Sequence, residues 1–140
     1  MTNAEIFSIA NTMAMPMWLL LIILPKWKVT RFLIDYKVIP LLLSLFYAHY
    51  IILHLQAGGG LDFGSLSSVM SLFTLEDLVM AGWVHYLAFD LLVGMWMINQ
   101  NRNLGIHQIL MAPCLIATFM LGPVGFLLFT VLKTIKSSRS

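Results

Sequence analysis

The sequence predicts an all-α membrane protein: a single domain of four transmembrane helices packed as a compact bundle. Of its 140 residues, 60% are hydrophobic and 10% are charged, which leaves too few polar side chains to cover a water-soluble protein. Four apolar stretches approach the roughly 20 residues that cross a bilayer core as a helix. The links between these stretches are too short to hold a soluble domain.

The expected helices cover residues 4–24, 38–56, 77–99 and 107–131, within one domain of residues 1–140. The first stretch has spanning length and contains Glu5 where a cleavable signal would be basic, so we expect it to stay in the membrane. Pro25 closes this helix. Pro40 falls in the first turn of the next one, where its missing N–H matters least.

The link of residues 57–75 predicts a short interfacial helix between the second and third spans. It starts with a flexible Gly58-Gly59-Gly60 turn. Apolar residues then recur at helical spacing, at Leu66, Val69, Met70 and Phe73. Thr74 is the expected N-cap of the third span. Glu76 and Asp77 follow it, where negative charge complements the helix dipole.

Two expected spans contain a proline near the middle. Pro16 removes a donor to the carbonyl of Thr12, and Pro123 removes one to Phe119. Freed carbonyls at membrane depth must face protein or a wet cavity. We expect the stretch 122–125, Gly-Pro-Val-Gly, to bend the fourth helix and to admit a neighbour or ligand closely, with packing alone as the alternative.

Basic residues near the helix ends predict the orientation. With four spans, the links 25–37 and 100–106 share a face and together carry five Lys and Arg residues. The opposite face carries three, in the C-terminal tail. This difference predicts that both termini lie outside the cytoplasm.

Asp90 lies near the middle of the third expected span. An ionised Asp at that depth costs roughly 2.5–3.5 kcal/mol, so such residues usually serve a function. Helical spacing places Glu76, Trp83 and Asp90 on one stripe, with Tyr86 one turn before Asp90. Such a stripe would make a wall for an amphipathic ligand with a polar end.

Two interpretations of Asp90 remain open. In the first, burial keeps it protonated so that it donates a proton or a hydrogen bond. In the second, the carboxyl is satisfied inside the bundle, for example by Asn11 beside the Pro16 kink, and fixes the helix register.

The histidines predict no strong metal site. His85 lies about 140° around the helix from Asp90, so spacing alone does not pair them. His49, deep in the second span, is a candidate proton carrier or ligand, or a structural residue. A site built from His49, His85 and Asp90 is an alternative, but the short-spaced histidines of membrane di-iron enzymes are missing. We expect no metal and no cofactor, and a net charge of +2 predicts no nucleic-acid partner.

Three stretches of the chain resemble one family of small membrane proteins. The matching positions are Asn11, Pro16, Trp18 and Pro25; Gly82, Trp83, His85, Asp90 and Leu91; and Pro113, Cys114, Gly122, Pro123 and Gly125. Together these positions resemble the abscisic-acid-deficient-4-like family, long known as a domain of unknown function. Its plant members are chloroplast proteins required to make neoxanthin from violaxanthin. Because this chain shows no transit peptide, the resemblance implies a bacterial member in the inner (cytoplasmic) membrane.

The resemblance implies a carotenoid or another isoprenoid lipid as ligand, and an isomerase as the enzyme class. Opening an epoxide to an allene needs a proton on oxygen and removal of a proton from carbon. By this hypothesis Asp90 is the acid and His85 the base. The expected substrate-binding residues are Trp83, Tyr86 and Trp96, with Glu76, Asp77, Asn11 and His49.

Two other function classes remain open. The chain could be a non-catalytic carotenoid- or lipid-binding or assembly subunit that presents substrate to a partner enzyme. It could also be a small transporter with Asp90 as a proton relay, which four helices would require to be a homo-oligomer.

Overall fold

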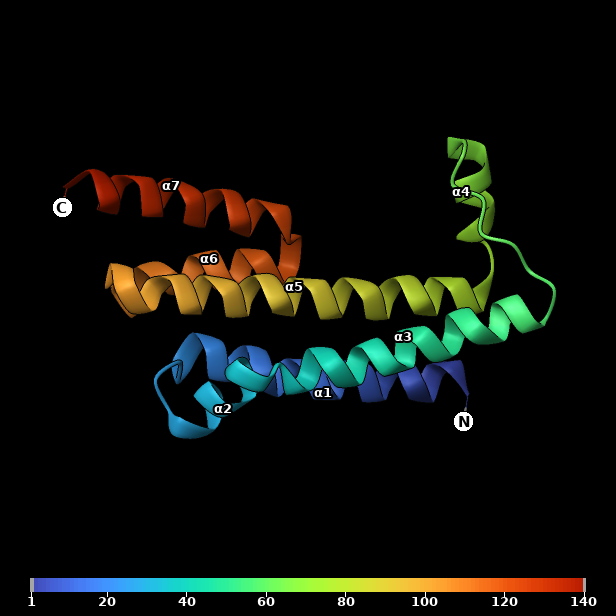
Figure 1. The fold of residues 1–140 in the computed structure, drawn as a ribbon, viewed down its shortest axis with the longest axis horizontal. Helices are drawn as coiled ribbons and strands as arrows, with labels where there is room; N and C mark the ends of the chain where they lie inside the picture. The colour runs from blue at the N-terminus through green and yellow to red at the C-terminus, as the bar shows by residue number, and fades with distance from the viewer. Residues whose placement is uncertain (1, 140) are drawn as a thin grey trace.

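The computed structural model describes residues 2–139, and every regular element in that range is a helix. The seven helices are α1 (Asn3–Ile23), α2 (Lys28–Tyr36), α3 (Val38–Gln56), α4 (Leu66–Leu72), α5 (Glu76–Leu104), α6 (Gln108–Leu121) and α7 (Pro123–Arg139). The long helices α1 and α3 both pack against α5, which forms the centre of the molecule (Figure 1). The prediction of an all-α protein is therefore confirmed.

Three helices of the described range are long and apolar enough to cross a membrane: α1 with 21 residues, α3 with 19 and α5 with 29. They correspond to the predicted spans 4–24, 38–56 and 77–99. The predicted fourth span, 107–131, is not one helix. It is divided into α6, with 14 residues, and α7, which folds back along α6 (Figure 1). The structure thus supports three spans and a helical hairpin instead of four spans.

The chain reverses at Gly122 because Pro123 cannot continue α6 and Gly122 adopts a positive φ. Pro123 has no N–H to donate to Phe119 and starts the next helix instead. Gly122 has a φ of +26°, in the region that side chains disfavour. A Cβ on Gly125 would overlap Thr118, so the absence of a side chain lets α7 approach α6 closely. The chain does bend at 122–125 as expected, but the bend reverses the chain direction and divides the expected helix into α6 and α7.

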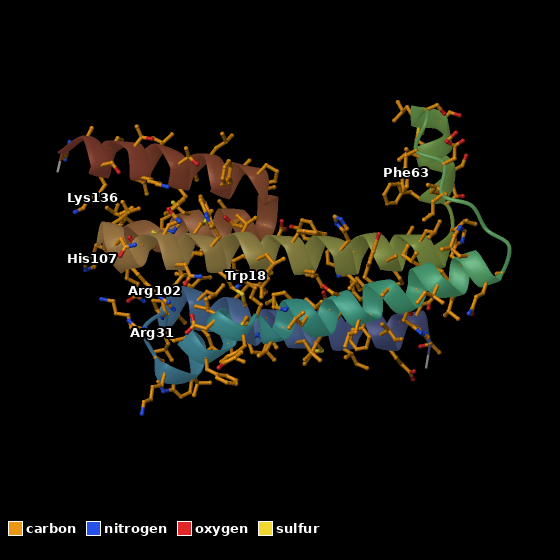
Figure 2. All side chains as sticks on the ribbon, viewed as in Figure 1. Trp18, Arg31, Phe63, Arg102, His107 and Lys136 are labelled. Atoms are coloured by element: carbon orange, nitrogen blue, oxygen red, sulfur yellow. The ribbon has the colours of Figure 1, made fainter. Side chains whose placement is uncertain are left out.

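The reversal separates the two ends of the chain. The N-terminus lies at one end of the bundle and the C-terminus at the other (Figure 1). Arg31, Arg102, His107 and Lys136 gather at the C-terminal end, as Figure 2 shows. The expectation that both termini lie on one face required four crossings, and residues 2–139 contain three helices long and apolar enough to cross a membrane.

The links hold two short helices. In the link 57–75, α4 is capped by the Ser65 side chain, which accepts from the Ser68 N–H, so a short helix exists there as predicted. Thr74 does not cap α5, because its hydroxyl donates to the Ser71 carbonyl at 2.6 Å. The sequence interpretation missed α2, whose inner face buries Thr30 and Ile34, one helical turn apart.

Candidate functional site at the tip of the hairpin

Asp90 lies halfway along α5, where the tip of the α6–α7 hairpin meets that helix. A Cβ built on Gly122 would lie 2.7 Å from Asp90 Oδ1, so the carboxyl group touches the backbone at the tip. The side chain is half-buried and its Oδ2 atom is fully buried. The expected intramembrane carboxyl group therefore faces protein at the break between two helices.

Tyr86 ties α5 to the same tip. Its hydroxyl donates to the carbonyl of Phe119 at 2.8 Å and to that of Met120 at 3.1 Å. These are carbonyls in the last turn of α6, which have no partner within their own helix. The freed Phe119 carbonyl was expected to face protein or a wet cavity. It faces protein, and Tyr86 supplies the donor. The Tyr86 phenol also interacts with the Asp90 carboxyl group.

One oxygen of Asp90 is not satisfied by the protein. Within residues 2–139, Oδ2 is buried and has no hydrogen-bond partner. Leaving a buried polar atom unpaired costs about 1–3 kcal/mol. The Asn11 amide does not donate to this oxygen in the described structure, and Asn11 Oδ1 instead accepts from Trp83 Nε1 at 2.9 Å. Asp90 thus has a binding capacity that the bundle does not use.

An aromatic wall leads along α5 to Asp90. We define it as Phe7, Trp83 and Tyr86, whose rings follow one another at centroid distances of 5.4 Å. Trp83 remains 37% exposed even though its indole N–H is bonded. The hairpin covers only the C-terminal half of α5 (Figure 1). The aromatic wall therefore begins beyond the hairpin and ends at its tip.

His85 occupies a different side of α5. Its ring stacks at 4.6 Å on Phe89 and lies 5.6 Å from the ring of Tyr47 in α3. Asp90 instead contacts Gly122. The two residues proposed as base and acid therefore have different neighbours, as their helical spacing predicts.

Two more of the predicted site residues lie apart from the wall. Trp96 lies against α7, with Phe129 at 5.4 Å, and the Lys133 ammonium is 5.6 Å from its ring centroid. His49 is exposed on α3, with its ring edge-on to Tyr50 at 5.9 Å. Neither residue is near the aromatic wall in the structure.

Glu76 and Asp77 hold the N-terminal ends of α1 and α5 together with the C-terminal part of α3. The Asn3 amide donates to Glu76 Oε1 at 3.0 Å and to Asp77 Oδ1 at 2.9 Å. The Tyr50 hydroxyl donates to Asn3 Oδ1 at 2.9 Å. This network joins α1, α3 and α5 and accounts for both acids structurally.

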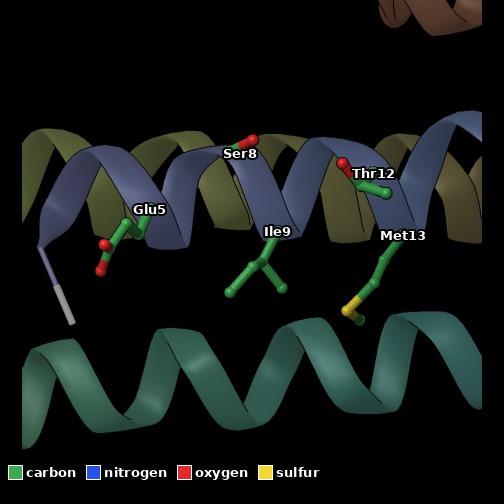
Figure 3. A pocket seen from close by; sticks show the side chains of 5 residues that line it. All are labelled: Glu5, Ser8, Ile9, Thr12 and Met13. Carbon is green, nitrogen blue, oxygen red and sulfur yellow. The ribbon is translucent and has the colours of Figure 1, made fainter.

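Asp90 does not line the cavities found along α1 and at the end of the bundle that carries Arg31 and Arg102. One of 540 Å³ lies along α1 and is lined by Glu5, Ser8, Ile9, Thr12 and Met13 (Figure 3). Another of 510 Å³ lies at the end that carries Arg31, Arg102 and His107. Sequence reasoning missed both cavities. The first is lined by residues of α1 alone, and the second depends on how separate segments meet. Among residues 2–139, no group of three or more His, Cys, Asp or Glu residues could hold a metal ion.

The fold and the site define a class: an α-helical membrane protein whose three long apolar helices pack with a broken helix beside a buried carboxyl group. Residues 5–129 match the family model described as ABA DEFICIENT 4-like, so the chain belongs to that family. No curated protein and no solved structure shows a significant match. The resemblance inferred from the sequence motifs is thus confirmed.

Proposed function

We propose that this protein binds an elongated isoprenoid lipid of the carotenoid type and isomerises it, with Asp90 as the acid. One observation carries the proposal: a buried, unpartnered carboxyl oxygen lies at the end of an aromatic wall, at the tip of a hairpin. Intramembrane carboxyl groups commonly mark working sites. Membership of the ABA DEFICIENT 4-like family supports the choice of ligand class, since the family resemblance implies neoxanthin synthesis.

The wall suits a long apolar ligand with a polar end. The apolar part of such a ligand would lie along Phe7 and Trp83, and its oxygen would reach Asp90. Aromatic rings bind flat conjugated chains through large contact areas and offset stacking. The exposed Met120 and Leu121 side chains at the hairpin tip would support the ligand from the other side.

The chemistry of an epoxide-to-allene isomerisation fits a carboxyl group without redox partners. The carboxylic acid gives its proton to the epoxide oxygen as the C–O bond breaks, which forms a hydroxyl group. A neighbouring carbon then loses a proton to a base, and its C–H electron pair forms the new double bond. Atoms and electrons balance within the substrate, and general acid–base catalysis of this type contributes about 10²–10⁴-fold.

The geometry supports Asp90 as the acid more directly than His85 as the base. His85 packs against Tyr47 and Phe89, so a substrate would have to wrap around α5 to meet both groups. We retain His85 as the candidate base because imidazole accepts protons near neutral pH. The carboxylate that Asp90 becomes after donation is the alternative acceptor.

The test measures conversion of violaxanthin by membranes from a carotenoid-free bacterial host that expresses the full chain. We expect Asp90→Asn to lower the product yield about 100-fold or more, whereas Asp62→Asn, the same change in an exposed loop, leaves it unaltered. The variant His85→Gln tests which of the two candidate bases, His85 or the Asp90 carboxylate, accepts the proton from carbon. Full turnover by Asp90→Asn would refute the acid assignment. Chromophore that stays bound to the purified chain without conversion would identify a binding subunit instead.

The second candidate, an oligomeric transporter, is favoured by the broken helix. The C-terminus of α6 and the N-terminus of α7 meet beside Asp90, and transporters use such interrupted helices to bind ions. Crosslinking in membranes and proton flux into proteoliposomes test this function. A monomer without flux would exclude it.

A further inference from the structure

The second cavity, at the opposite end of α5 from Glu76, is built differently from the hairpin site. Its volume is 510 Å³, and it lies where α1 ends, α2 begins, α5 ends and α6 begins. Its charged and polar lining consists of Lys26, Arg31, Arg102, Asn101, His107 and Gln108. We propose that this cavity binds the phosphate group of an anionic membrane lipid.

The cavity has an excess of positive charge. Three of its lining residues are cationic: Lys26, Arg31 and Arg102. Arg102 is the one that is paired, with both terminal nitrogens 3.3 Å from Asp35 Oδ1. In the described part of the chain, the side chains of Lys26 and Arg31 have no ion-pair or hydrogen-bond partner. Two cations are thus available for a ligand anion, and guanidinium groups bind phosphate oxygens in a two-pronged geometry.

The walls of the cavity are held in place by hydrogen bonds. Asn101 closes the turn between α5 and α6: its amide donates to the Ile106 carbonyl at 2.9 Å and accepts from the Ile106 N–H at 2.7 Å. The Gln108 amide donates to the carbonyls of Ile22 and Ile23, at 2.9 and 2.7 Å, where α1 ends. The turn is therefore fixed to α1 without a ligand, and preorganisation of this kind lowers the cost of binding.

His107 adds a hydrogen-bond donor. Its Nδ1 atom accepts from the Ile109 N–H at 3.1 Å. The neutral ring must therefore carry its hydrogen on Nε2, which is left to donate. A phosphate oxygen is a suitable acceptor for this N–H.

The apolar lining of the cavity favours a lipid over a free anion. Leu21, Ile98, Met111 and Leu115 are buried behind it, and Ile22 and Pro25 remain partly exposed. A soluble anion gains nothing from Ile22 and Pro25, whereas a hydrocarbon chain buries apolar area against them. The cations lie at the end of the spans, at headgroup level. The arrangement matches an amphiphile with a phosphate head, and it is independent of the Asp90 site.

The test uses the full chain, purified in a neutral detergent, and native mass spectrometry. The probes are phosphatidic acid, phosphatidylcholine and inorganic phosphate. We expect retention of phosphatidic acid over phosphatidylcholine, and about tenfold weaker binding in each of Arg31→Gln and Lys26→Gln. Lys136→Gln removes a cation at the same end but outside the cavity, and should bind as the wild type does.

The outcomes separate a defined site from general attraction. Equal losses in Lys136→Gln and Arg31→Gln, or equal binding of phosphatidylcholine, would overturn the proposal. Tight binding of inorganic phosphate alone would also overturn it, because the apolar walls would then have no role. Weak inorganic phosphate binding together with the expected variant pattern supports the lipid. Because Arg31 and Lys26 make no ion pair or hydrogen bond within the described range, their replacement should not unfold the protein.

Discussion

The carboxyl group of Asp90 lies directly against Gly122, and a Cβ on that glycine would approach Oδ1 to 2.7 Å. This contact joins the middle of the longest helix to the tip of the hairpin. Two features favour glycine at position 122: the close Asp90 carboxyl group and the backbone φ of +26°.

Gly122→Ala should destabilise the hairpin. The new methyl group meets both the carboxyl group and an unfavourable φ, which together cost about 1–3 kcal/mol. The measurement is the free energy of unfolding in detergent. Gly60→Ala is the matched control, because a Cβ there has no atom within 4 Å. Equal stability of the two variants would show that the contact between Asp90 and Gly122 is absent.

Tyr86→Phe should loosen the hairpin without changing the aromatic wall. The substitution keeps the ring but removes the donor to the carbonyls of Phe119 and Met120, which costs about 1–3 kcal/mol. Hydrogen exchange of peptides covering 118–126 should become faster. Tyr36→Phe is the control, since Tyr36 is 65% exposed and contacts only the ring of Phe32 among the aromatic residues of the structure. Unchanged exchange in Tyr86→Phe would contradict the bond.

The hairpin predicts the topology of the chain in the membrane. All eight Lys and Arg residues belong to the links and the tail at the end marked by Arg31, Arg102 and Lys136 (Figure 2). The positive-inside rule therefore predicts a cytoplasmic C-terminus and an N-terminus on the opposite side. Reporter enzymes fused to each end measure this directly. Reporters that place both ends on one side would instead require a fourth crossing.

The loop before α4 should lose hydrogen-bonded structure at acidic pH. The Gly64 N–H donates to Asp62 Oδ1 at 2.8 Å and the Ser68 hydroxyl to Oδ2 at 3.0 Å. These bonds lower the pKa of Asp62, with the Gly64 bond as the larger cause. Their contribution is complete above the ordinary carboxyl pKa of about 3.9, and it is lost as the pH falls through the lowered value.

Amide protection in residues 62–72, corrected for intrinsic exchange, measures this effect between neutral and strongly acidic pH. In the wild type, protection should fall at the acidic end. Asp62→Asn should show lower protection at neutral pH and no such fall. A fall of equal size in Asp62→Asn would assign the pH dependence to other groups.

The sequence was sufficient for the three spans and for the stripe that leads to Asp90. It was not sufficient for the hairpin, because hydropathy continues unbroken through 107–131 and only a bend follows from Pro123. The reversal depends on how closely Gly125 approaches Thr118, which is a contact between two helices. Trp96 shares the helix of Asp90 but packs against Phe129 of α7. Helical spacing on the third span could not predict that Trp96 packs against α7, away from the aromatic wall.

The missed helix α2 and the basic cavity have different explanations. The segment 28–36 has an amphipathic pattern at helical spacing, with Thr30 and Ile34 on its buried face, so a signal was present in a link between two far more apolar stretches. The cavity draws its cations from Lys26, Arg31 and Arg102, which lie on separate elements. No local spacing relates these residues, so their proximity requires the tertiary structure.

The 14 residues of α6 extend about 21 Å, against a hydrocarbon core of about 30 Å. The hairpin thus displaces the acyl chains mainly from one leaflet, and the lipids of the other leaflet can extend up to its tip. A hydrophobic molecule dissolved in that leaflet could diffuse sideways to Asp90 without passing through water or headgroups. For the ligand proposed above, entry would then depend on lateral partitioning within the bilayer instead of on an aqueous channel.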